Sequence, residues 1–407
     1  MPIRHVPFWL DRVAKARRPS YERFKGQAET TVAIVGGGLT GCACAFSFAA
    51  AGLKVILLEA EQVGAGATAA SPGLVRDGFD GSFGETVSRH GLKAARHMWQ
   101  MMRRASLDFQ AALRRLEAKC ECAPVDLIQF IGRDAAELKR LGRECRDRRA
   151  AGLDHSFLAG TALARAAALD SSGAIRTPGA ALDPYRACLA LAAAAAKRGA
   201  AIYEQSPVRT IRAGRKSVEL GLERGTITAD YIVIATASPI PDLRALRRHL
   251  EARHSYVVVT EPLPAGVRRA VGRRAAALQD ANNPPHVLRW LKDDRVLFAG
   301  AGQPELPSRL RGKTLVQRTG QLMYELSILY PPISGLQPEW SWDLAHYETV
   351  DRLPFVGHHR NFPRHLFALG RLGDGAGFAW LAARILLRQL QGEPARGDDL
   401  FAFTRVL

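Results

Sequence analysis

The sequence lacks a long uninterrupted apolar run and lacks the pattern of a secretory signal. Residues 1–29 contain no continuous apolar stretch of the length that such a signal needs. The longest apolar segment, residues 41–60, is interrupted by Gly52 and Lys54, which excludes it as a membrane-spanning helix. We therefore expect a cytoplasmic protein with no transmembrane segment.

Cysteine is scarce and is not spaced for metal binding. The six cysteines form no CxxC pair, and the CxC pairs at 42–44 and 120–122 have no histidine or further cysteine at zinc-ligand spacing. No Ser/His/Asp or Cys/His order carries a local signature of nucleophilic catalysis. The sequence predicts no metal site, and its cysteine usage is typical of a reducing compartment.

Acidic residues are outnumbered, 39 against 57 basic residues, which gives a net charge of +18. Of the basic residues 47 are Arg, and they are spread along the chain without a nucleic-acid-binding motif. We attribute the charge to a compositional bias and expect no nucleic-acid partner. An anionic substrate stays open.

The chain does contain a β-α-β pattern near its start. Residues 30–36 and 53–60 are continuous apolar, β-branched runs that predict strands of a parallel sheet, and residues 39–52 between them have helical character. Such a unit needs about 30 residues, which is the length seen here.

Gly36, Gly38 and Gly41 form a GxGxxG motif at the mouth of this helix. The first glycine permits a tight turn, the second lets a pyrophosphate approach the backbone, and the third lets helix and strand pack closely. Glu59 closes the second strand 18 residues after Gly41, where a carboxylate binds ribose hydroxyls and argues against a 2′-phosphate. The motif predicts a dinucleotide site but does not by itself distinguish NAD from FAD.

Three features favour FAD. There is no second GxGxxG for a nicotinamide nucleotide, and the motif lies near the N-terminus of a chain that continues beyond a buried strand at 231–237. Residues 370–380, GRLGDGAGFAW, predict a strand–glycine loop–helix element. The N-terminus of that helix suits the negative charge of a reduced flavin.

The chain resembles the FAD-dependent glycine/D-amino acid oxidase (DAO) family over residues 20–405. The similarity is carried by VAIVGGGLTG, VILLEAEQVGAGAT, ADYIVIATAS, DRLPFVG and LFALGRLGDGAGFAW, and it is strongest toward the gamma-glutamylputrescine oxidase-like branch. The resemblance implies an α/β fold with a Rossmann-like FAD-binding domain of DAO/glutathione-reductase type and a mostly antiparallel α+β substrate domain. We expect an N-terminal arm at 1–27, the FAD domain at 28–90, 181–244 and 346–405, and the substrate domain at 91–180 and 245–345.

The resemblance also implies the FAD contacts. Gly36, Gly38 and Gly41 would bind the pyrophosphate, and Glu59 would bind the ribose. Four further segments supply the other contacts: Gly66, Ala67, Thr68 and Ser71; Val208; Ala235 and Thr236; and Gly373, Gly375 and Ala376. The loop 63–75, VGAGATAASPGLV, is then a channel beside the cofactor, where bulk or charge would block binding.

Some positions depart from the family pattern. Pro72 and Asp374 replace the usual Gly and His, and an Asp near the anionic edge of a reduced flavin affects its redox behaviour. No Cys follows Cys188 and no His lies between Glu59 and Asp80, the positions that relatives use for covalent attachment. We expect non-covalent FAD.

The predicted reaction is oxidation of the C–N bond of an amine or amino acid by hydride transfer to the flavin, giving an imine that hydrolyses. Such chemistry depends on orientation more than on a strong base. Candidate substrate-side residues are Arg289, Arg352, His286 and Tyr256. Oxidation of a hydroxy acid on the same fold, or a catalytically degenerate FAD-binding scaffold, are the alternatives, and O2 or another carrier is the expected electron acceptor.

Overall fold

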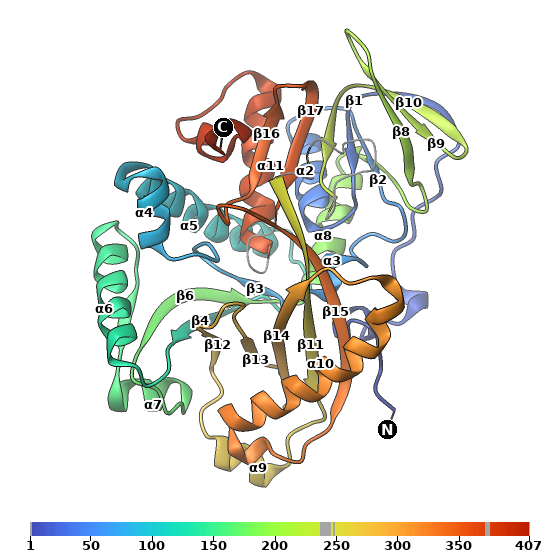
Figure 1. Ribbon diagram of the computed structural model, residues 1–407. Coiled ribbons are helices and arrows are strands. Elements are labelled where there is room, and N and C mark those ends of the chain that lie inside the picture. The colour runs from blue at the N-terminus through green and yellow to red at the C-terminus, as the bar shows by residue number, and fades with distance from the viewer. Residues whose placement is uncertain (1, 237–245, 247–248, 371–374, 407) are drawn as a thin grey trace.

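The computed structural model describes residues 2–236, 246, 249–370 and 375–406, which form two β-sheets with helices packed against them (Figure 1). One sheet occupies the upper part of Figure 1 and the other the lower part. The α/β fold class and the mostly antiparallel second sheet are confirmed.

The first sheet has a parallel centre. Its order is β16-β17-β10-β1-β2-β7, in which β16 alone runs antiparallel to its neighbour among the described strands of this path. All four residues of β2 are buried, as expected for a strand covered on both faces. Strands β8, β9 and β10 form an antiparallel meander beside this path. The strands are β1 Gly26–Val35, β2 Val55–Leu58, β7 Ala201–Tyr203, β8 Val208–Ala213, β9 Val218–Leu222, β10 Gly225–Ile234, β16 Phe355–His359 and β17 Phe362–Leu369.

Four helices share the apolar core beside this sheet: α2 Leu39–Ala50, α5 Leu92–Arg115, α8 Pro184–Ala196 and α11 Ala376–Gln391. Helix α2 contacts both α8 and α11, and α5 contacts α11. Asp183 and Pro184 define the start of α8: the Asp183 carboxylate accepts a hydrogen bond of 3.0 Å from the N–H of Arg186, and Pro184 occupies the first turn.

The second sheet has the order β15-β11-β14-β13-β12-β4-β6-β3, with β5 paired to β6. Its described pairs are antiparallel except β12 with β4. The strands are β3 Leu74–Val75, β4 Ala123–Phe130, β5 Ser156–Leu158, β6 Ala174–Ala181, β11 Leu250–Thr260, β12 Ala276–Asp280, β13 Val287–Trp290, β14 Val296–Pro304 and β15 Pro338–Thr349.

Helix α10, Ser308–Leu329, packs against β11, β14 and β15. The remaining helices are α1 Phe8–Asp11, α3 Ala67–Ala70, α4 Phe83–His90, α6 Ala135–Ala150, α7 Gly160–Ala167 and α9 Ala265–Val271. Short 3-10 turns lie at Lys15–Arg17, Pro331–Ile333, Asp398–Phe401 and Phe403–Val406.

The chain passes from one sheet to the other more than once, and the N-terminal arm packs against elements next to both sheets. Strand β3, within the predicted FAD segment 28–90, pairs with β6 of the second sheet. Phe8 and Trp9 of the arm are buried in one apolar cluster with Tyr185 and Trp342. The domain boundaries given above stay a prediction.

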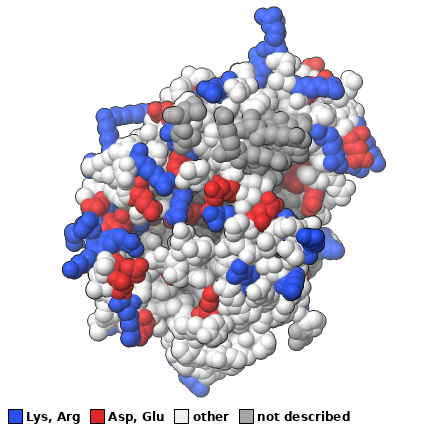
Figure 2. Space-filling view, in the orientation of Figure 1, with Lys and Arg blue, Asp and Glu red and all other residues white. Residues whose placement is uncertain are grey.

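Lys and Arg side chains are interspersed with Asp and Glu on the face shown in Figure 2. Within the described part of the chain, no helix combines the length and the apolar character needed to span a bilayer. The six cysteines are unpaired.

Candidate functional site

The glycine motif lies where β1 meets α2, and close approach explains two of its glycines. Gly36 has φ +112°, and a Cβ there would stand 2.8 Å from the carbonyl oxygen of Ala235. A Cβ on Gly41 would stand 1.9 Å from the carbonyl oxygen of Gly36. Gly38 is the N-cap of α2, so the helix N-terminus with its partial positive charge opens beside the motif.

The Glu59 carboxylate is held at the carboxyl end of β2. Its Oε2 accepts a hydrogen bond of 2.6 Å from the N–H of Gly37, and its Oε1 accepts one of 2.9 Å from Glu61. The side chain is therefore oriented by the backbone beside the glycine motif, where ribose hydroxyls of a dinucleotide would lie.

The loop 63–75 is anchored on both sides, and it includes the helical turn α3. The Thr68 hydroxyl accepts a hydrogen bond of 2.9 Å from the N–H of Leu39, in the first turn of α2. The indole of Trp9 donates to the carbonyl of Ser71 at 3.0 Å, and that of Trp342 donates to Ala70 at 2.9 Å. These hydrogen bonds hold the loop beside the N-terminus of α2, where it forms one wall of a cavity.

These parts surround a cavity of about 350 Å³. Eleven of the residues predicted to contact FAD line it: Gly36, Gly38, Glu59, Gly66, Ala67, Thr68, Ser71, Val208, Ala235, Thr236 and Gly375. Gly41 and Ala376 were predicted as FAD contacts but do not line the cavity. Gly41 packs against the backbone of Gly36, and Ala376 is buried as the first residue of α11. Gly373, like Asp374, lies outside the described residues. The set fits an extended dinucleotide, because open glycine backbone, a helix N-terminus and a carboxylate follow one another along the cavity.

A second cavity, of about 380 Å³, adjoins the first. The two share the lining residues Leu344 and His346 on β15. Four arginines and three carboxylates are among the described residues that line the second cavity: Arg76, Arg89, Arg253 and Arg352, and Asp80, Glu251 and Glu348. It is therefore a charged cavity that borders the dinucleotide cavity at Leu344 and His346.

Of the four residues predicted on the substrate side, Arg352 lines this second cavity and the other three do not. The Arg289 side chain is buried, and its Nη1 donates to the carbonyls of Pro72, Gly73 and Leu182 at 2.9, 2.9 and 2.6 Å. Its guanidinium also lies 4.8 Å from the ring centroid of Trp9. In this position Arg289 supports the loop 63–75 from behind.

His286 and Tyr256 have other partners. His286 lies between Asp280 and Glu325, at 2.7 and 3.0 Å, and stacks on Phe298. Burial lowers its pKa, but the hydrogen bonds and charges of the two carboxylates outweigh burial, and the net pKa is raised. The Tyr256 hydroxyl accepts a hydrogen bond of 2.6 Å from Gln303, and burial raises its pKa. The cavity geometry gives neither residue a role toward substrate.

Sequence reasoning missed most of the charged lining. His346 and Glu348 follow Leu344 at intervals of two on β15, and Glu251 and Arg253 alternate in the same way on β11. Side chains at such intervals share one face of a sheet. That alternation was the available signal, but it indicates a face and not which cavity the face borders.

Comparisons with known proteins give a family match over most of the chain. The sequence model of the family described as FAD dependent oxidoreductase (DAO) matches residues 31–389. The chain is 24% identical over 377 residues to gamma-glutamylputrescine oxidoreductase of Escherichia coli strain K12, spanning 90% of this chain and 85% of that protein. It is 23% identical over 389 residues to glycine oxidase of Bacillus licheniformis, spanning 91% and 95%.

Solved structures share the fold. Glycine oxidase of Geobacillus kaustophilus superposes with a TM-score of 0.75 at 21% identity, over 93% of this chain and 99% of that one. L-proline dehydrogenase of P. horikoshii gives 0.76 at 16% identity, over 92% and 97%.

Replacing Arg289 distinguishes a supporting role from a substrate contact. We expect Arg289→Met to lower the free energy of unfolding by about 1–3 kcal/mol, because three buried carbonyls lose their donor. Urea unfolding of the FAD-loaded protein measures this. A large increase in substrate KM with unchanged stability would instead identify Arg289 as a substrate contact.

Proposed function

The chain belongs to the DAO family of FAD-dependent oxidoreductases, and from this membership and the joined cavities we propose that it oxidises the C–N bond of an amine or amino acid. The proteins that it resembles include a gamma-glutamylputrescine oxidoreductase and a glycine oxidase, whose names give an amine and an amino acid as substrates. The observation that carries the proposal is the charged cavity that borders the dinucleotide cavity at Leu344 and His346.

In this proposal the protein holds FAD without a covalent bond. Gly36, Gly38 and the N-terminus of α2 bind the pyrophosphate, and Glu59 binds the ribose. Gly66, Ala67, Thr68 and Ser71 would line the space for the rest of the cofactor, and the N-terminus of α11 would stabilise negative charge on the reduced flavin. Bound FAD supplies the acceptor for a hydride.

In this proposal the chain's own residues orient the substrate. The substrate lies in the second cavity with its C–H bond directed toward the shared boundary at Leu344 and His346. Loss of a hydride from the carbon next to the nitrogen of the neutral amine would leave an iminium ion, which water would hydrolyse to a carbonyl compound and the released amine or ammonia. Orientation of this kind supplies a large part of the rate enhancement.

Anaerobic mixing with a panel of amines and amino acids tests the reaction. We expect the flavin absorbance near 450 nm, the ordinary band of oxidised flavin, to bleach with at least one amine in the absence of oxygen. A stopped-flow spectrometer follows the bleaching, and admission of O2 then tests whether oxygen is the acceptor or whether another carrier is required.

The same panel separates the alternatives. Bleaching by hydroxy acids but not by amines would favour the hydroxy-acid reaction. Tightly bound FAD that no compound bleaches would favour a scaffold, a possibility raised by Pro72 and Asp374. For location we propose the cytoplasm, which suits six unpaired cysteines.

A further inference from the structure

Two arginines of the second cavity have no carboxylate partner among the described residues. Arg89, on α4, donates to the carbonyl of Val350 at 3.1 Å. Arg352 donates to the side-chain oxygen of Asn283 at 3.4 Å. Arg253 differs from both, because it forms ion pairs with Glu251 at 3.2 Å and Glu348 at 3.0 Å.

Arg89 forms no ion pair with Glu85, because the Glu85 carboxylate has another partner. Glu85 stands four residues before Arg89 on α4, the spacing at which helical ion pairs form. Its carboxylate instead accepts a hydrogen bond of 2.9 Å from the N–H of Ser82, while the Ser82 hydroxyl accepts one of 3.0 Å from Glu85. This capping box holds the start of α4 and leaves the guanidinium of Arg89 for the cavity.

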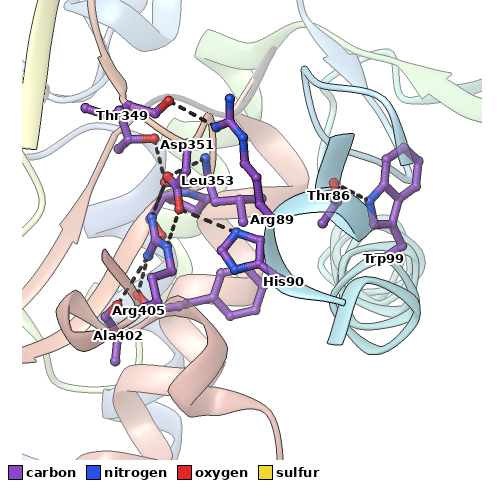
Figure 3. Close-up of polar contacts among 12 residues, drawn as sticks. Thr86, Arg89, His90, Trp99, Thr349, Asp351, Leu353, Ala402 and Arg405 are labelled. Carbon is purple, nitrogen blue, oxygen red and sulfur yellow. Dashed lines mark hydrogen bonds and ion pairs between the residues drawn. The ribbon is translucent and has the colours of Figure 1, made fainter. Parts of the chain in front are cut away.

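Arg352 forms no ion pair with the adjacent Asp351 for a similar reason. The Asp351 carboxylate accepts hydrogen bonds of 2.7 and 3.0 Å from Arg405, and His90 approaches it from the other side at 3.8 Å (Figure 3). The Asp351 side chain therefore faces the C-terminal segment. Arg352 itself has φ +58°, a conformation that costs a non-glycine residue energy and that the surrounding turn maintains.

The two guanidiniums belong to one end of the cavity. Arg89 binds the carbonyl of Val350, two residues before Arg352, so both side chains are built around the same turn. Both also line a smaller neighbouring recess, and neither lines the dinucleotide cavity. Arg89 and Arg352 are thus not part of the boundary at Leu344 and His346, where we place the oxidised bond.

We propose that the substrate is an amine that carries a carboxylate several bonds away from the C–N bond that is oxidised, and that Arg89 and Arg352 bind this distal carboxylate. The proposal rests on the function given above and specifies its substrate class. Guanidinium groups bind planar carboxylates through paired N–H donors. The three acidic side chains that line the same cavity disfavour a group of higher negative charge.

The test compares each acid with its own amide on the FAD-loaded enzyme. Glutamate and glutamine (both enantiomers), and 4-aminobutyrate and its amide, are the substrate pairs. We expect kcat/KM to be roughly tenfold or more in favour of an acid in the wild type, and the preference to disappear in R89Q/R352Q, mainly through KM. R133Q is the matched control, because Arg133 is exposed and pairs with Asp170 on the surface.

A binding measurement keeps this test separate from the reaction. Glutarate, which has no C–N bond, should perturb the flavin absorbance or release heat on titration, with roughly tenfold weaker affinity in R89Q/R352Q and unchanged affinity in R133Q. Because Arg89 is exposed, salt screens its charge, and glutarate should bind more weakly at high salt. Single variants R89Q and R352Q, each checked by thermal unfolding, show whether a loss reflects folding.

The outcomes are distinguishable. If no amine bleaches the flavin but glutarate binds and its binding depends on the two arginines, the anion site stands and the proposed reaction fails. If amines bleach the flavin with no preference for acids over amides, or if the preference survives in R89Q/R352Q, the reaction stands and the distal-carboxylate site is wrong.

Discussion

Gly41→Ala should yield a protein that retains roughly a tenth or less of the wild-type FAD and unfolds more easily by about 1–3 kcal/mol or more. The added Cβ would stand 1.9 Å from the carbonyl oxygen of Gly36 and 3.4 Å from the Ile34 side chain. The backbone at Gly36, directly after β1, cannot yield as a flexible side chain would, so α2 must move away from the sheet. That movement displaces the helix N-terminus proposed to bind the pyrophosphate. The ratio of flavin to protein absorbance after purification measures the loss.

Gly142→Ala is the matched control. Gly142 lies inside α6 without a positive φ, and a Cβ added there would meet none of the described atoms within 4 Å outside its own helix turn. The same substitution should there be neutral or stabilise by about 0.5–1 kcal/mol, since alanine is the better helix former. Circular dichroism confirms that Gly41→Ala still folds. Full FAD content in a folded Gly41→Ala protein would contradict the packing argument.

The nucleotide-binding half could be predicted because its signals are local. Gly36, Gly38, Gly41 and Glu59 stand within one β-α-β unit, and close backbone approach requires the glycines at positions 36 and 41. The buried strands and the start of α8 follow from apolar runs and from Asp183-Pro184. These features need no knowledge of the distant chain.

The substrate side could be predicted only in part, because distant segments assemble it. Arg352 was expected there and does line the cavity, but Arg89 and His346 reach it through the packing of α4 and the pairing of β15 with β11. Arg289 looked equivalent to Arg352 in sequence. Its burial follows from contacts with Trp9 and the loop near Pro72, which are 280 and 217 residues away along the chain.

The C-terminal Arg405 should be among the most important residues for stability. Its side chain and that of Asp351 are 4% and 8% exposed, and it also donates to the carbonyls of Pro354 and Phe401 at 2.7 and 2.9 Å. We expect Arg405→Gln to lower the free energy of unfolding by about 3–5 kcal/mol, because a buried carboxylate loses its partner. Urea unfolding at pH 7 measures this. Arg104→Gln, which breaks only an exposed pair with Asp108, should change it by about 0.5 kcal/mol or less.

The pH dependence of Asp351→Asn tests the same pair from the other side. Burial raises the pKa of Asp351, but the hydrogen bonds and charge of Arg405 outweigh burial, and the net pKa is lowered from 3.8. A carboxyl with a lower pKa in the folded state stabilises the protein above its unfolded pKa and loses this contribution as the pH falls toward the folded value. The stability difference between wild type and Asp351→Asn should therefore be constant near neutral pH and shrink below about pH 4. A difference that stays constant down to pH 3 would mean that the ion pair does not fix this turn, and the position of Arg352 would then need another cause.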